Sequence, residues 1–211
     1  MLRVEFATLG SLPPHVDAGA APLIVMPFID PALARRAAAQ LAGRAGLGGV
    51  LLAVYDENRS GFVAVANRLF RASTSASFGY VAQDAFAGRD WLARGQTALT
   101  TGGGGLLAFN DGKWHGALAA FGLADRGWAA ANYGGDLFHP GYRSHYADAE
   151  LTVLALATAK HRYDPESLLV EVDWDKEAKG ADAADRALFK ARAAAGFDGR
   201  VTAPKLLTLF G

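Results

Sequence analysis

The fold is decided by the stretch Leu23-Ile24-Val25-Met26-Pro27-Phe28, a continuous apolar run at the start of a repeating pattern. An Ala- and Arg-rich segment at residues 31–45 follows and predicts a helix. After the glycines at positions 46, 48 and 49, a second apolar run occupies residues 50–55 (VLLAVY). Continuous apolar runs of this kind are typical of parallel strands buried on both faces. The stretch therefore predicts a strand–helix–strand unit.

The same alternation continues along the chain. We expect a helix at residues 61–72 and a third strand at residues 78–82, and this order favours a mostly parallel sheet covered on both faces. Residues 100–105 (TTGGGG) cannot form a stable helix, because each glycine loses much conformational entropy on folding. We expect a flexible loop or a point of close backbone approach there.

A helix is also predicted near the C-terminus, at residues 181–195. Leu188 and Phe189 fall on its inward face, and Gly196 fits its end. Its charged residues are expected to form a solvated face without chemistry: Asp182, Asp185, Arg186, Lys190 and Arg192.

The composition is that of one ordinary globular domain. The chain has 211 residues, 51% of them hydrophobic, and its 21 basic side chains balance its 21 acidic ones. A chain without net charge has no general attraction for nucleic acid or anionic membranes, so we expect a small-molecule partner and no nucleic acid. It has no Cys, no apolar run of signal-peptide length and no transmembrane segment, which predicts a soluble, cytoplasmic protein without thiolate metal sites.

Carboxylates follow the predicted strands, where ligands bind in open α/β sheets. Asp56 ends the second strand and Asp84 follows the third, so Asp84 is a candidate for a metal or phosphate site, with capping of the next turn as the alternative. Asp148 and Glu150 open an apolar helix predicted to reach Ala159, with Asp148 as its N-cap. Capping and the helix dipole would account for both residues without any catalytic role.

The region between Phe109 and Tyr146 is rich in aromatic and histidine residues, namely Trp114, Trp128, His115, His139 and His145. Aromatic rings are good platforms for sugars and bases, although such residues also serve as ordinary packing. The histidines lack the i, i+4 spacing of a helical zinc site. The region is therefore a candidate for ligand contact but not for a histidine metal cluster.

The order of these features resembles the GT-A glycosyltransferases, especially family 2 and its small bacterial and phage relatives. The resemblance covers residues 22–175 and rests on six segments: 24–28, Asp56, 61–67, 80–85, Trp91-Leu92 and the aromatic loop 140–151. It implies a Rossmann-like three-layer α/β/α sandwich with a mostly parallel mixed central sheet. Residues 1–211 would form one domain with a nucleotide-binding half at 22–95 and an acceptor-side half at 96–175.

The resemblance also implies an activity, the transfer of a sugar from a nucleotide diphosphate donor, often a UDP-sugar, to a hydroxyl acceptor. Asp84 would hold Mn²⁺ or Mg²⁺, which stabilises the departing diphosphate. Asp148 would be the general base, with Glu150 as its alternate. The nucleotide would contact five residues: Pro27, Phe28, Asp56, Asn67 and Gln83.

The chain departs from the family pattern at the metal motif. Many members carry Asp-x-Asp, whereas Ala82 stands at the first position here, and a later His of the family is replaced by the segment containing Glu171 and Asp173. Either acid could complete the metal shell, since hard oxygen ligands suit Mg²⁺ and Mn²⁺. The reduced motif leaves a second function open, a non-catalytic nucleotide or nucleotide-sugar binding protein. A Rossmann-type oxidoreductase is disfavoured, because no G-x-G-x-x-G follows the first strand.

Overall fold

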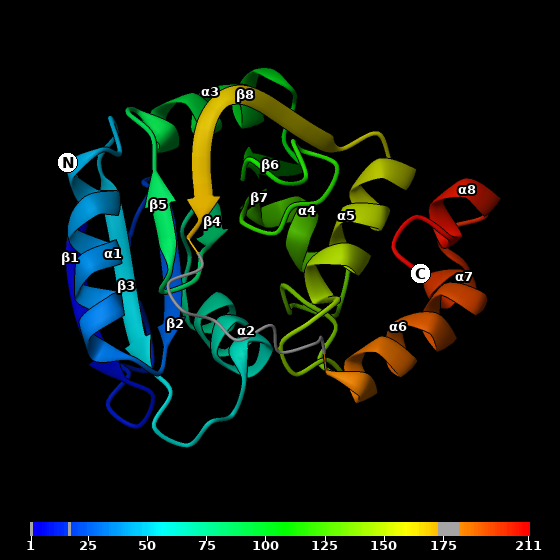
Figure 1. The fold of residues 1–211 in the computed structure, drawn as a ribbon, viewed down its shortest axis with the longest axis horizontal. Helices are drawn as coiled ribbons and strands as arrows, with labels where there is room; N and C mark the ends of the chain where they lie inside the picture. The colour runs from blue at the N-terminus through cyan, green and yellow to red at the C-terminus, as the bar shows by residue number, and fades with distance from the viewer. Residues whose placement is uncertain (1, 17, 173–181) are drawn as a thin grey trace.

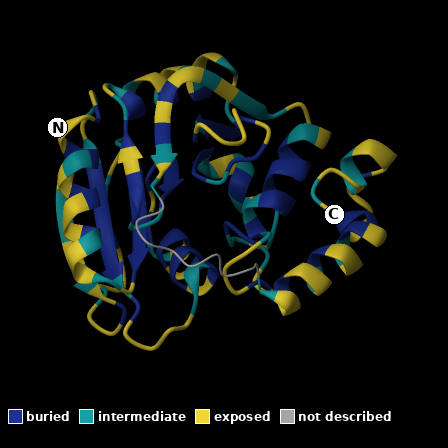
Figure 2. Ribbon diagram, viewed as in Figure 1, coloured by how far each residue is buried: buried dark blue, intermediate teal, exposed yellow. Residues whose placement is uncertain are grey.

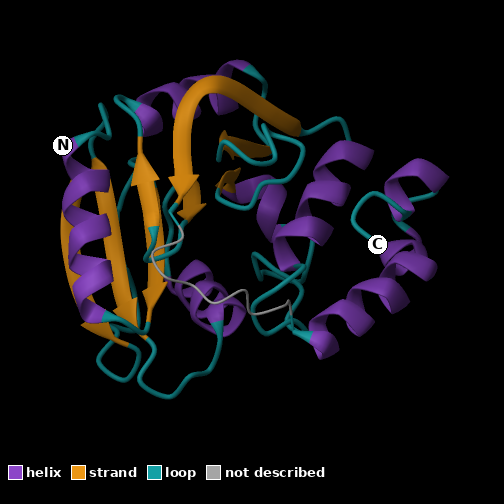
Figure 3. Cartoon of the chain, viewed as in Figure 1, coloured by secondary structure: helices purple, strands orange, loops and turns teal. Residues whose placement is uncertain are grey.

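An eight-stranded sheet runs through the molecule in a computed structural model that describes residues 2–16, 18–172 and 182–211 (Figure 1). The order of the strands is β1-β3-β2-β4-β7-β6-β8-β5. Their bounds are β1 Leu2–Thr8, β2 Leu23–Phe28, β3 Gly49–Tyr55, β4 Ser77–Tyr80, β5 Ala85–Ala87, β6 Leu106–Asn110, β7 Gly122–Asp125 and β8 His161–Glu171. The long strand β8 curves from β6 to β5, which gives the sheet its curled shape (Figure 3).

The sheet is mixed, with parallel pairing in its first half. Strands β1, β3, β2 and β4 run parallel to one another, as does the pair β6 and β8. Strand β7 runs antiparallel to both β4 and β6, and β5 antiparallel to β8. The predicted strand–helix–strand unit is therefore confirmed, as is a mixed sheet with a parallel majority. The N-terminal edge strand β1 has no counterpart among the sequence-based expectations.

Helices cover both faces of the sheet. The side chains of each strand point alternately to the two faces, so each face has its own hydrophobic core against the helices. Leu23 and Val25 of β2 belong to one core cluster, and Ile24 and Met26 belong to the other. Strands β2 and β3 are buried along most of their length (Figure 2). The first cluster includes residues of α2 and α5, and the second includes residues of α1 and α3. The helices are α1 Pro31–Gly43, α2 Phe62–Ala72, α3 Trp91–Thr101, α4 Arg126–Ala130, α5 Ala147–Ala157, α6 Ala183–Ala194, α7 Gly196–Gly199 and α8 Pro204–Leu207. In the part of the chain described, no helix is long and apolar enough to cross a membrane.

The glycine run at residues 100–105 matches its prediction in part. Thr100 and Thr101 complete the last turn of α3, so the helix extends two residues into the segment expected to lie outside helices. Gly105 has φ +107°, and a Cβ on it would lie 2.0 Å from the carbonyl oxygen of Lys160. The expected close backbone approach is therefore confirmed at Gly105, where β6 begins beside β8.

The C-terminal helix is confirmed as α6, but the prediction that its charged residues form a solvated face is wrong for two of them. Asp185 is buried and accepts hydrogen bonds from three backbone N–H groups at residues 143–145. Arg192 lies largely buried against Glu150 of α5. Buried charges are retained only where partners compensate the loss of water, and both partners come from segments distant in the sequence.

Candidate active site

A cleft of about 410 Å³ lies at the carboxyl ends of β2 and β3. Five residues predicted from the sequence line it together: Pro27, Phe28, Asp56, Gln83 and Asp84. Phe28 ends β2 and Asp56 follows β3, so the sheet topology itself places them side by side. Ligands of open α/β sheets bind in such a crevice outside the carboxyl ends of the strands.

Hydrogen bonds within the protein fix the walls of this cleft. The two carboxylate oxygens of Asp56 accept from the N–H groups of Ser60 (2.9 Å) and Gly61 (2.8 Å), which closes the loop before α2. Oε1 of Gln83 accepts from the N–H groups of Ile29 (2.8 Å) and Asp30 (2.9 Å). Each carboxylate oxygen can accept more than one hydrogen bond, so Asp56 keeps capacity for a ligand.

Asn67, predicted to contact the nucleotide, occupies a different place. It is buried in α2, where its Nδ2 donates to the carbonyl oxygen of Phe138 and its Oδ1 accepts from the N–H of Phe138, both at 2.9 Å. The paired bonds tie α2 to the segment before α5. In the described part of the chain, Asn67 is not among the residues lining the cleft, and its amide serves the fold.

Asp84 lies between β4 and β5, and it is only 6% exposed although it lines the cleft. The N–H of Val172 donates to the carbonyl oxygen of Asp84 at 3.0 Å, and Glu171 pairs with Ala85 across β5 and β8. The backbone thus brings Glu171 beside Asp84, whereas Asp173 lies outside the described residues. Among the described residues, no group of three His, Asp or Glu side chains is arranged to hold a metal ion.

A second cavity of about 540 Å³ adjoins the cleft, because Ser144 lines both. Asp148 lines this second cavity together with Lys113, Trp114 and His145. The predicted base and the predicted metal ligand therefore line two neighbouring cavities that share Ser144. This arrangement suits a reaction between two bound molecules, one in each cavity.

Asp148 is the second residue of α5, and Tyr146 is the N-cap residue, so the predicted cap position of Asp148 is wrong. Burial raises the pKa of Asp148 to about 6, although the backbone N–H groups of Asp148 and Ala149 oppose this effect; the charge of Glu171 raises the pKa further. The charge of Asp148 in turn contributes, after burial, to the raised pKa of Tyr80, whose hydroxyl donates to the carbonyl oxygen of Ala119 at 2.7 Å. A carboxyl with a pKa near 6 can accept a proton at neutral pH.

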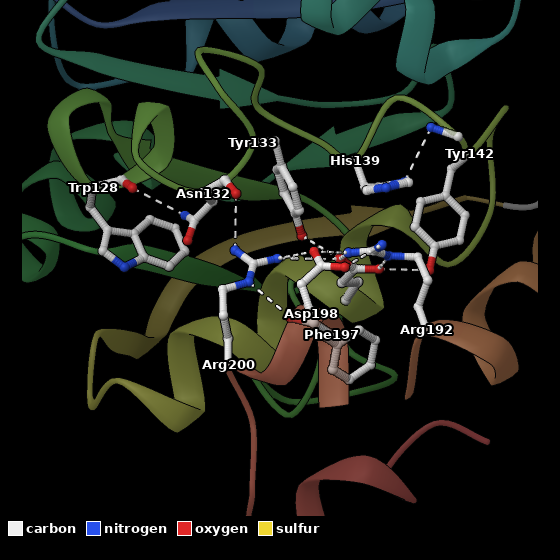
Figure 4. A network of polar contacts seen from close by, with 11 residues as sticks. Trp128, Asn132, Tyr133, His139, Tyr142, Arg192, Phe197, Asp198 and Arg200 are labelled. Atoms are coloured by element: carbon white, nitrogen blue, oxygen red, sulfur yellow. Dashed lines mark hydrogen bonds and ion pairs between the residues drawn. The ribbon is translucent and has the colours of Figure 1, made fainter. Parts of the chain in front are cut away.

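Glu150 belongs to a buried polar network around α5 and α6. Figure 4 shows this network and labels the partners Tyr133, Tyr142 and Arg192. Its oxygens accept from Arg192 at 2.7 and 2.8 Å and from the hydroxyls of Tyr133 (2.9 Å) and Tyr142 (2.8 Å). Arg200 approaches within 3.8 Å. The carboxylate is fully buried and already receives four hydrogen bonds, and this position argues against the role of an alternate base.

Comparisons of the sequence with protein-family models and with curated proteins gave no match. Among solved structures, the chain is similar to a mannosyltransferase from Pyrobaculum calidifontis in complex with GDP-Man and Mn²⁺, with a TM-score of 0.56 and 16% sequence identity. The chain therefore shares a fold with this structure over the matched region. The similarity covers 85% of this chain and 62% of the mannosyltransferase, so the chain spans less than two thirds of that enzyme's length.

Two arginines that line the cleft were missed by the sequence-based prediction. Arg59 and Arg143 line the cleft with Asp84, and Nη2 of Arg143 donates to the carbonyl oxygen of Arg59 at 3.0 Å. Gly61 permits this approach, because it has φ +102° and a Cβ on it would lie 2.6 Å from the carbonyl oxygen of Arg143. Arg59 lies three residues after Asp56, the acid at the end of β3, and this position was the sequence signal that could have identified it. Arg143 joins the cleft only through tertiary contacts.

Proposed function

We propose that this protein is a glycosyltransferase that moves a sugar from a nucleotide diphosphate to a hydroxyl group of an acceptor. The observation that carries the proposal is that two neighbouring cavities share Ser144, with Asp84 lining one and Asp148 lining the other. The similarity to a mannosyltransferase supports it through the fold. Fold alone does not fix an activity, so the side chains of the two cavities carry the argument.

The cleft suits the nucleotide diphosphate. Pro27 and Phe28 offer an apolar wall for the base, and Asp56 an acceptor at the carboxyl end of β3. Arg59 and Arg143 place two guanidinium groups in the same cleft, and such groups bind phosphate oxygens through paired N–H donors. The resemblance to family 2 favours UDP as the nucleotide, and the complex of the structural relative contains GDP-Man, so both diphosphates belong in the test.

The residues at the cleft fit a divalent cation in part. Asp84 offers a buried carboxylate, and Mg²⁺ or Mn²⁺ sites often use one or two protein carboxylates together with phosphate oxygens of the substrate. Asp84 would hold the cation, and Glu171 stays a prediction as a second ligand. When bound, the cation would neutralise charge that develops on the departing diphosphate.

Asp148 would act on the acceptor. In an inverting displacement, the acceptor oxygen forms a bond to the anomeric carbon while the bond from that carbon to the phosphate oxygen breaks. The hydroxyl proton passes to the Asp148 carboxylate, and the electron pair of the broken bond leaves with the nucleoside diphosphate. The two guanidinium groups of Arg59 and Arg143 would stabilise the negative charge that this leaving group gains.

The rate of donor turnover should rise with pH through the pKa of Asp148. Because burial raises that pKa to about 6, the carboxylate that accepts the proton is mostly absent below this pH and fully present above it. We expect the release of nucleoside diphosphate from a UDP- or GDP-sugar to increase up to about pH 7 and then level off. A profile of kcat/KM against pH measures this, and a flat profile across that range would contradict the role of Asp148.

Replacing Asp84 with Asn should weaken nucleotide binding only when a cation is present. Loss of the carboxylate removes a ligand of Mn²⁺, so calorimetric titration with UDP or GDP should show an affinity at least about 10-fold lower with Mn²⁺ and unchanged without it. Glu166→Gln is the matched control, since Glu166 is exposed and outside both cavities. Equal weakening in both conditions would contradict a metal role for Asp84.

The reduced metal motif, with Ala82 where many family members carry an acid, favours one second candidate, a nucleotide or nucleotide-sugar binding protein without catalysis. The same titration separates the two functions. Binding of UDP or GDP that ignores Mn²⁺ and yields no turnover of the donor would favour the binding protein. No binding in either condition would contradict both.

A further inference from the structure

The cavity beside Asp148 is bordered by two loops that are held in the same way. Oδ1 of buried Asp111 accepts from the backbone N–H groups of Lys113 (3.0 Å), Trp114 (2.7 Å) and His115 (3.3 Å). On the other side, the carboxylate of buried Asp185 accepts from the N–H groups of residues 143, 144 and 145 at 2.8 to 2.9 Å. Hydrogen bonds to a carboxylate are about twice as strong as neutral ones, so both loops are firmly placed.

Each of these loops also holds a residue in left-handed backbone conformation. His115 has φ +47° and Tyr146 has φ +63°, and neither is a glycine. Such conformations carry strain, and they persist where the surrounding structure determines them, often at ligand sites. Burial alone would raise the pKa of Asp185, but the three backbone N–H groups that donate to its carboxylate outweigh burial and lower the pKa. The Asp185 carboxylate therefore stays ionised at neutral pH. The walls of the cavity are thus formed before any ligand arrives.

Trp114 is the large aromatic side chain that this arrangement presents. It is 39% exposed, lines the cavity and contacts Phe210 edge to face at 6.1 Å between ring centroids. Around it, Lys113, Ser144 and His145 supply polar groups, and Asp148 lies in the same cavity. An exposed aromatic ring flanked by hydrogen-bonding groups matches a ligand with one apolar face and many hydroxyls.

We propose that this cavity is the acceptor site and that the acceptor is a saccharide, whose ring stacks on Trp114 while one hydroxyl faces Asp148. The inference rests on the proposed function, because it identifies the class of molecule that receives the sugar. A pyranose ring presents C–H groups on one face and hydroxyls at its edge, which suits the negative face of the indole and the polar rim. The volume of about 540 Å³ lies within the range of small-molecule sites.

The test uses ¹⁹F NMR of the full chain labelled with 5-fluorotryptophan, titrated with methyl pyranosides of glucose, galactose, mannose and N-acetylglucosamine. The chain has four Trp residues, and Trp114→Phe assigns the resonance of Trp114. We expect at least one probe to shift this resonance while that of Trp91, which is fully buried, stays in place. Because Phe keeps an aromatic face, Trp114→Phe should retain binding. Trp114→Ala should raise the Kd of the probe about tenfold.

The control variant is Trp128→Phe, which changes a tryptophan that does not line the cavity and should leave the Kd unchanged. Titration of the same samples with UDP and GDP distinguishes a failure of the saccharide acceptor from a failure of the proposed transferase function. If a nucleotide binds but no probe moves the Trp114 resonance, the saccharide acceptor is overturned and the transferase stands. If a probe binds at Trp114 but neither nucleotide binds, the transferase fails and the acceptor role fails with it.

Discussion

Replacing Asp148 with Asn is expected to lower the rate of sugar transfer about 10²–10⁴-fold, the usual contribution of a positioned general base. The amide has nearly the shape of the carboxyl but cannot accept the proton of the acceptor hydroxyl. Nucleotide affinity should not change, because Asp148 lines the second cavity and not the cleft with Asp84. Turnover of a UDP- or GDP-sugar and calorimetric titration of the nucleotide measure the two quantities separately.

The same variant should fold at least as well as the original protein. A carboxyl whose pKa is raised by burial is penalised when ionised, so above its unfolded pKa the charge of Asp148 lowers the stability of the native state. Removing that charge at neutral pH should therefore not lower the midpoint of thermal unfolding. Glu166→Gln, at an exposed carboxylate, should change neither rate nor stability. Full activity of Asp148→Asn would exclude Asp148 as the base.

The first half of the fold could be predicted because its signals are local. The apolar run of β2 and its helix α1 lie together in sequence, and the strand-end acids Asp56 and Asp84 follow directly from where strands stop. Parallel pairing of β2 with β3 then brings Phe28 beside Asp56 without further information. Five of the seven predicted nucleotide and metal residues that the structure describes therefore line one cleft, and the other two are Asn67 and Glu171.

The errors fall on polar residues whose partners are distant in the sequence. Asn67 pairs with Phe138, Glu150 with Arg192, and Asp185 with the loop at residues 143–145. No periodicity or capping preference records such contacts, because each depends on how α5 and α6 pack. The prediction of Asp148 as the N-cap of α5 was wrong for a related reason. Asp favours N-caps in general, but the backbone at Tyr146 turns left-handed and begins the helix earlier than the capping preference predicts.

Replacing Glu150 with Ala is expected to lower the free energy of unfolding by about 3–5 kcal/mol, the effect of removing one partner of a buried ion pair. Glu150 is fully buried and the Arg192 side chain is only 11% exposed, so the guanidinium would lose its nearest counter-charge and be left with the exposed carboxylate of Asp198 at 2.9 Å. The hydroxyls of Tyr133 and Tyr142 would lose their acceptor as well. Urea denaturation of the two proteins measures the difference.

The control is Glu5→Ala, which breaks the exposed pair Arg3–Glu5, whose side chains are 66% and 42% exposed. This change should alter stability by no more than about 1 kcal/mol. Glu150 and Asp148 lie in the first turn of the same helix, so their variants separate two roles for two neighbouring carboxylates. Asp148→Asn should lower the rate of sugar transfer and should not lower the free energy of unfolding. Glu150→Gln should lower the free energy of unfolding, while the molecules that remain folded transfer sugar at the original rate. If Glu150→Gln instead folded normally and lost transfer while Asp148→Asn kept it, Glu150 would be the base and the assignment of Asp148 would be wrong.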